Sequence, residues 1–131
     1  MKKITKSILL VVSLVLPAIC LAQKSGTYKC VATYNHGEPW PTENETFYIE
    51  FDKEGCTTYR LSDGEFKFPQ RYEFERKSGS GTYEYRKGCE IMKNLWCWDY
   101  LSFSNDYTEY RKMYRCPEST YEFDWVFKKI K

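Results

Sequence analysis

The stretch FYIEFDKEGCTTYRL, residues 47–61, contains the pattern that decides the fold class. Phe47, Ile49 and Phe51 occupy alternate positions, and this two-residue period is typical of a β-strand with one buried face. Residues 52–55 form a turn signal, because Asp and Gly tolerate the backbone conformations that tight turns require. The alternation resumes after the turn. The stretch therefore predicts two antiparallel strands joined as a hairpin.

The same alternation recurs along the rest of the chain, and turn signals separate the segments. Regularly spaced short strands are typical of antiparallel barrels and sandwiches. We expect an all-β, antiparallel, up-and-down barrel of about eight strands, because closure would remove exposed strand edges; a β-sandwich is the alternative. Besides the strand at residues 47–52, the expected strands lie near residues 27–34, 56–61, 66–75, 82–87, 95–103, 107–116 and 121–128.

Residues 1–22 have the parts of a secretory signal peptide. A basic start is followed by an apolar run over residues 8–16 and by the small residue Ala22. This order predicts cleavage before Gln23. We therefore expect an exported protein, periplasmic or extracellular, whose mature chain is a single all-β domain over residues 24–131.

Two alternatives to cleavage remain open. Cys20 could carry a lipid and anchor the protein to the outer envelope, although the large Ile19 before it disfavours this. The segment could also stay as an anchor, but its uncharged stretch is shorter than the roughly 20 residues that a bilayer-spanning helix needs. The rest of the sequence has no comparable apolar run. We expect no membrane span in the mature chain.

Removal of the signal changes the composition that any function must use. The mature chain would have 109 residues, with 17 Lys and Arg against 18 Asp and Glu, so its net charge falls from +2 to −1. This balance, together with export, argues against a nucleic-acid partner. All 24 aromatic residues remain, whereas Ile, Leu and Val fall to eight in total. The core must therefore be built from Phe, Tyr and Trp.

Five cysteines remain in the mature chain, so at least one thiol stays outside any set of intramolecular disulfides. Cys89 and Cys97 are symmetric about Lys93, and a hairpin loop at residues 92–94 would place them opposite each other. We expect a Cys89–Cys97 disulfide on this ground, because exported small domains commonly use such bonds. A spare thiol is either a reactive or intermolecular-bridging group, or an inert buried one, which we favour. No CxxC motif is present.

The sequence lacks a plausible catalytic set. His36 is the sole histidine and lies in a polar loop, so a Ser-His or Cys-His site has weak support. Glu73 and Glu75 share one strand face, but nearby arginines make a solvated outer face the simpler explanation. We expect no enzyme activity, no cofactor and no metal site.

The sequence LWCWDYLSF, residues 95–103, supplies the main candidate binding site. On a strand, Trp96, Trp98 and Tyr100 share one face at about 6.8 Å spacing. If the other face is the core, these rings point outward and form a stacking platform for a flat ligand such as a carbohydrate. The alternative is that the Trp face is the core, which Asp99 on the opposite face supports.

The loop at residues 35–45 offers a second candidate site. Trp40 lies between two prolines there. It could face a small apolar molecule held in the barrel mouth. It could also insert into a protein partner, since a stiffened Trp suits an interface hot spot. We therefore expect non-catalytic binding of a carbohydrate or a small apolar molecule, with an inhibitor or immunity-type protein acting on an exported enzyme as the alternative.

Two partial resemblances accompany these patterns. Gly-Thr-Tyr at residues 26–28 before a meander resembles lipocalin-like secreted barrels, which have Trp where Tyr28 stands. Tyr-Lys-Cys at residues 28–30, with Ser-Gly at 78–79 and Lys-Gly at 87–88, resembles bacterial inhibitors of C-type lysozyme, although the spacing differs. Both resemblances imply a small secreted barrel, and no site residue is transferred from either family.

Overall fold

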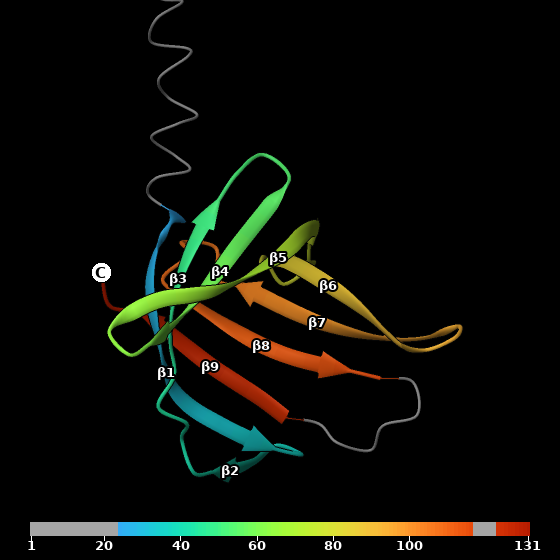
Figure 1. Ribbon diagram of the computed structural model, residues 1–131, viewed down its shortest axis with the longest axis horizontal. Coiled ribbons are helices and arrows are strands. Elements are labelled where there is room, and N and C mark those ends of the chain that lie inside the picture. The colour runs from blue at the N-terminus through green and yellow to red at the C-terminus, as the bar shows by residue number, and fades with distance from the viewer. Residues whose placement is uncertain (1–23, 117–122) are drawn as a thin grey trace, which may run out of the picture.

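The computed structural model describes residues 24–116 and 123–131, and all nine strands in this part of the chain belong to one antiparallel sheet (Figure 1). The predicted signal peptide lies outside the described residues. The strands are β1 (Gly26–Asn35), β2 (Glu38–Trp40), β3 (Thr46–Phe51), β4 (Gly55–Ser62), β5 (Glu65–Lys77), β6 (Tyr83–Met92), β7 (Leu95–Phe103), β8 (Glu109–Arg115) and β9 (Phe123–Lys129).

The sheet is an up-and-down meander that closes into a ring. From β3 to β9 each strand pairs with the next in sequence, and the pairing of β1 with both β3 and β9 closes the ring. The predicted all-β antiparallel class is therefore confirmed, and the ring is barrel-like. One strand was not expected: the short β2 forms inside the predicted loop at residues 35–45 and pairs with the end of β1.

The hairpin at residues 47–61 forms as predicted, from β3 and β4. Ile49 pairs with Thr58, and Phe51 pairs with Cys56. The Oδ1 atom of Asp52 closes the turn, because it accepts hydrogen bonds from the backbone N–H of Glu54 and of Gly55 at 2.9 and 3.0 Å. A Cβ at Gly55 would lie 2.0 Å from the carbonyl oxygen of Tyr72, so β4 and β5 need a glycine here.

Aromatic rings fill the closed interior, as the composition predicts. Tyr28, Phe103 and Phe127 are completely buried. Tyr110 connects them: its ring stacks on Phe127 at 4.6 Å and lies 4.8 Å from Phe103, measured between ring centroids. Each ring of this size buries roughly 150–250 Å², which compensates for the scarcity of aliphatic side chains.

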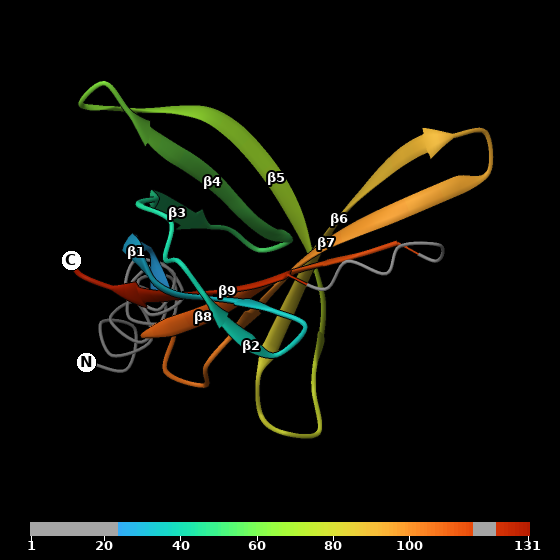
Figure 2. The ribbon, with the colours of Figure 1, turned by 90° about the horizontal axis from the view of Figure 1, so that it is seen from below.

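The pairing between β5 and β6 is short. Pairing there covers only Glu73–Lys77 against Tyr83–Arg86. Beyond it, residues 87–92 pair with β7 alone, and the β6–β7 hairpin projects from the ring (Figure 2). Lys87-Gly88 resembles a turn signal in the sequence, but no turn forms there, because β6 continues through these residues to Met92. In the described part of the chain, no strand covers this outer edge of β6.

Candidate functional site

Strand β7 presents its three candidate ligand-binding aromatics on the outer side of the sheet. Cys97, Leu101 and Phe103 point into the core and are at most 1% exposed. The intervening side chains therefore face outward: Trp96 is 44% exposed, and Trp98 and Tyr100 are half-buried. This arrangement is the platform geometry expected if the aliphatic face is the core.

The position of Asp99 does not require the Trp face of β7 to be the core. It lies on the inner side, where its carboxylate is 3.7 Å from the ammonium of Lys87 on β6. The two residues are register partners, so the ion pair is local to the β6–β7 hairpin. An acidic residue on the core side of β7 is tolerated because a cation beside it offsets the cost of partial burial.

The two indoles of the platform contact each other and residues of the neighbouring strand β6. The rings of Trp96 and Trp98 stack with centroids 6.0 Å apart and planes 24° apart. Gly88 lies beneath them: a Cβ there would be 2.8 Å from the Trp98 ring and 3.2 Å from the Trp96 ring. The guanidinium of Arg86 lies 4.2 Å from the Trp98 centroid, a cation–π contact.

A polar hollow continues the platform beyond Tyr100. It has a volume of about 220 Å³. Within it, Arg76 and Glu84 form an ion pair at 2.9 Å, and Glu75 at the rim pairs with Arg86 at 3.4 Å. These groups offer hydrogen-bond donors and acceptors next to the aromatic surface. The hollow is lined by Glu75, Arg76, Glu84, Tyr100, Met113 and Arg115.

Trp40, the fourth predicted site residue, is separate from this platform. It lies on β2 opposite the buried Thr33 of β1, and its ring packs edge-on against Phe123 of β9 at 6.0 Å. The side chain is 50% exposed. The structure thus groups three of the four predicted ligand-binding residues and places Trp40 on a different strand and face.

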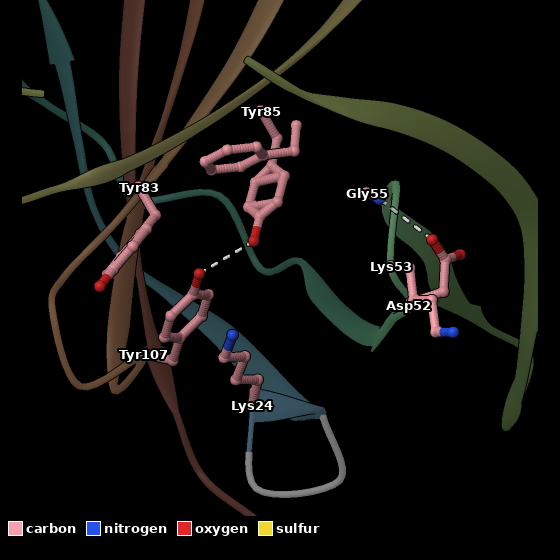
Figure 3. Close-up of a pocket in the computed structure, with 8 residues that line it drawn as sticks. Lys24, Asp52, Lys53, Gly55, Tyr83, Tyr85 and Tyr107 are labelled. Carbon is pink, nitrogen blue, oxygen red and sulfur yellow. Dashed lines mark hydrogen bonds between the residues drawn. The ribbon is translucent and has the colours of Figure 1, made fainter. Parts of the chain in front are cut away.

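Sequence reasoning missed a second pocket, at the end of the ring where β1 begins (Figure 3). It has a volume of about 230 Å³, and its lining comes from five separate segments, so no local motif marks it. The hydroxyls of Tyr85 and Tyr107 meet at 2.9 Å, and the ammonium of Lys24 lies 5.0 Å from the Tyr107 centroid. Tyr107 has a φ of 58°, a strained conformation for an aromatic residue.

Two tyrosines of this pocket, Tyr85 and Tyr107, have raised pKa values. Burial is the main cause that raises the pKa of Tyr85, and its hydrogen bond with Tyr107 raises it further. Burial also raises the pKa of Tyr107, partly offset by the hydrogen bond from Tyr85. The pocket presents tyrosine hydroxyls and aromatic walls, together with the amines of Lys24 and Lys53 and the carboxyl group of Asp52.

The disulfide differs from the predicted pair. Cys89 and Cys97 face each other across β6 and β7, as the predicted hairpin requires, but the structure bonds Cys97 to Cys116, and Cys89 is a free, exposed thiol. The Cα atoms of Cys97 and Cys116 are 4.4 Å apart, the spacing of a narrow, non-hydrogen-bonded antiparallel pair. A residue that forms a narrow pair on one side forms a wide, hydrogen-bonded pair on the other, so Cys97 and Cys89 are a wide pair. Cys116 is therefore nearer to Cys97 than Cys89 is. A disulfide is typical of an oxidising compartment.

The remaining candidate catalytic residues, His36, Glu73 and Glu75, do not form a common site. His36 is exposed in the β1–β2 turn, and its Nδ1 is 2.7 Å from Oδ1 of the neighbouring Asn35. Glu73 and Glu75 are exposed and each lies 3.4 Å from an arginine, Arg71 and Arg86 respectively. Among residues 24–116 and 123–131, no group of three His, Cys, Asp or Glu side chains could hold a metal ion. The same residues contain no helix long and apolar enough to cross a membrane.

No protein-family model, curated protein or solved structure matches this chain. The resemblances to lipocalin-like barrels and to C-type lysozyme inhibitors therefore stay predictions, and any assignment of function has to come from the residues themselves.

Proposed function

We propose that this protein is an exported, non-catalytic carbohydrate-binding domain whose ligand rests on Trp96, Trp98 and Tyr100. The observation that carries the proposal is the stacked, outward-facing pair of indoles on β7. Sugar rings have apolar C–H faces, and flat aromatic surfaces at the water boundary are suited to pack against them.

The surroundings of the platform support a ligand that is polar at its edge. Glu75, Arg76 and Glu84 lie in the hollow next to Tyr100, where they can exchange hydrogen bonds with hydroxyl groups. Arg86 and Gly88 fix the orientation of the Trp98 ring, so the surface is formed before the ligand arrives. Such preorganisation lowers the entropy cost of binding.

A glycan array followed by calorimetric titration tests this proposal. Trp96→Ala and Trp98→Ala should each weaken binding of the captured glycan by about tenfold, which is about 1.4 kcal/mol. Phe68→Ala is the matched control, because Phe68 is an aromatic residue 60% exposed outside the platform, and it should leave binding unchanged. Equal glycan binding by the wild type and a Trp96→Ala, Trp98→Ala double variant that keeps its fold would refute the platform.

The second candidate function is inhibition of, or immunity to, an exported enzyme through Trp40. It rests on the half-exposed ring held against Phe123 at 6.0 Å. A large aromatic anchored on one side and open on the other resembles an interface hot spot. Loss of a captured protein partner on Trp40→Ala, with capture retained in Trp96→Ala, would favour this function over carbohydrate binding.

A further inference from the structure

We propose that Cys89, Cys97 and Cys116 form a thiol–disulfide exchange site, in which Cys89 attacks the disulfide that Cys97 makes with Cys116. The proposal does not depend on the carbohydrate platform. It starts from three cysteines on three adjacent strand segments, of which the central one, Cys97, has a sulfur-bearing neighbour on each side.

The register of the sheet places the three side chains in one row. Cys97 on β7 is the direct partner of Cys89 on β6. On its other side, the last register pair of β7 and β8 is Trp98 with Arg115, so the next position joins Cys97 to Cys116. Directly opposed residues of antiparallel strands point to the same face of the sheet. All three sulfur atoms therefore lie on the inner face of the β6–β7–β8 segment.

Both pairs fit the reach of a disulfide. The Cα atoms of Cys97 and Cys116 are 4.4 Å apart. The wide antiparallel pair, to which Cys89 and Cys97 belong, has a Cα separation of about 5.5 Å, inside the range of about 4.4–6.8 Å that disulfides span. Exchange between the two pairs thus needs only rotation of the cysteine side chains. The register of the strands does not have to change.

The exchange step balances without another reactant. The thiolate of Cys89 attacks Sγ of Cys97, a Cys89–Cys97 bond forms, and the Cys97–Cys116 bond breaks. The bonding electrons leave with Sγ of Cys116, which takes up the proton that Cys89 has lost. One disulfide and one thiol are present before and after the step, so nothing is oxidised or reduced overall. Because Cys97 lies between the other two sulfurs, the attacking and leaving groups are on opposite sides of it.

Accessibility assigns the attacking role to Cys89. It is exposed and lies on the uncovered edge of β6, whereas Cys97 is only 1% exposed. The other two free thiols, Cys30 and Cys56, are buried in the aromatic core. Burial raises the pKa of Cys30 and raises that of Cys56 to about 12, so neither forms a competing thiolate near neutral pH.

Disulfide mapping of the full, unreduced protein tests the proposal. The sample is incubated at mildly alkaline pH, quenched with acid and labelled with N-ethylmaleimide, and then cleaved after Lys93 and Arg115, which separates the three cysteines. We expect two linked forms: Cys97–Cys116 with the label on Cys89, and Cys89–Cys97 with the label on Cys116. Recovery of Cys97–Cys116 alone, with Cys116 never labelled at any incubation time, would overturn the proposal.

Two single variants sharpen this result. Cys89→Ser removes the attacking thiol, so Cys116 should remain unlabelled throughout. Cys116→Ser removes the competing partner, and a folded variant should form the Cys89–Cys97 bond. A Cys116→Ser protein with a wild-type circular dichroism spectrum and labels on both Cys89 and Cys97 would contradict the proposal. If Cys116→Ser fails to fold, the mapping of the wild-type protein still decides.

Discussion

The guanidinium of Arg86 on β6 lies 4.2 Å from the centre of the Trp98 ring on β7, a contact between two strands that alternation within one strand does not predict. Arg86 and Trp98 do not form a direct register pair, since Arg86 pairs with Tyr100 and Gly88 with Trp98. Arg86 and Trp98 are instead diagonal neighbours across the two strands. The long arginine side chain reaches the indole because Gly88 leaves room for the ring to lie over β6.

Arg86→Ala should loosen Trp98 and destabilise the protein modestly. A cation–π contact at an exposed site contributes about 0.5–1 kcal/mol, and the ion pair with Glu75 adds little because it is solvated. We expect a loss of near-ultraviolet circular dichroism from the indoles and a slightly lower urea midpoint. Arg60→Ala, which removes only an ion pair with Glu45, should leave the indole signal unchanged. An unaltered indole spectrum in Arg86→Ala would show that the arginine does not orient Trp98.

Gly88→Ala should damage the platform more than the fold. The new Cβ would lie 2.8 Å from the Trp98 ring, and the ring can move because it is the far end of a side chain on the outer face. Glycan affinity should therefore fall severalfold while the free energy of unfolding changes little, as titration and urea unfolding would measure. Gly79→Ala, where a Cβ meets no atom within 4 Å, is the control. A large loss of stability in Gly88→Ala would mean that the indole rings cannot move to accommodate the new Cβ.

Asp52→Asn should change how stability depends on pH. The hydrogen bonds from Arg71 hold the pKa of the Asp52 carboxyl well below its usual range. Because the folded-state pKa is the lower one, the carboxylate contributes stability above the unfolded pKa of about 3.9, and this is lost as pH falls through the folded pKa. Both side chains are partly exposed, so the contribution is at most about 1 kcal/mol.

Urea unfolding at neutral pH and near pH 3 measures this effect. The Asn variant should be less stable than the wild type at neutral pH, and the difference should shrink in acid. Glu38→Gln, at an exposed position on the short strand β2, should show no such convergence. A constant difference between Asp52→Asn and the wild type at both pH values would assign the effect to the turn and not to the charge.

Tyr85→Phe should destabilise the protein by about 1–3 kcal/mol, because it leaves the buried hydroxyl of Tyr107 without this hydrogen-bond partner. The double variant Tyr85→Phe, Tyr107→Phe should recover part of that loss, since no orphaned hydroxyl remains. Thermal or urea unfolding measures both. Tyr59→Phe is the control, as Tyr59 is only half-buried on β4. Strictly additive losses in the double variant would show that the two hydroxyls are not coupled.

The fold class and much of the candidate site could be predicted from the sequence. Alternation at Phe47, Ile49 and Phe51 predicts a strand with a buried face, and the turn at residues 52–55 closes the hairpin in the structure. The same rule places Trp96 and Trp98 on one face of a single strand. These inferences succeeded because period-two alternation and turn chemistry are local properties of the chain.

Contacts between distant segments were beyond such reasoning. The pocket around Tyr85 and Tyr107 joins five segments that lie between Lys24 and Tyr107 in the sequence. The residues at 87–88 resemble a turn in sequence, but Gly88 stays in β6 because a neighbouring strand pairs with it and an indole lies over it. Some glycines are required because another side chain or strand packs against them, and others because a turn needs their backbone freedom. The sequence alone does not distinguish the two kinds, since the packing neighbour comes from another part of the chain.

The sequence by itself determined that the chain folds into antiparallel strands, that its core is aromatic, and which side chains of β7 share a face. Only the tertiary structure decided which of those faces points outward, and that Cys97 bonds to Cys116 with Cys89 beside it. The reason is physical: alternation fixes the relative direction of neighbouring side chains, whereas burial and disulfide partners depend on which strands lie on either side. For β7, that neighbourhood leaves the indoles at the surface and sets three cysteines in a row.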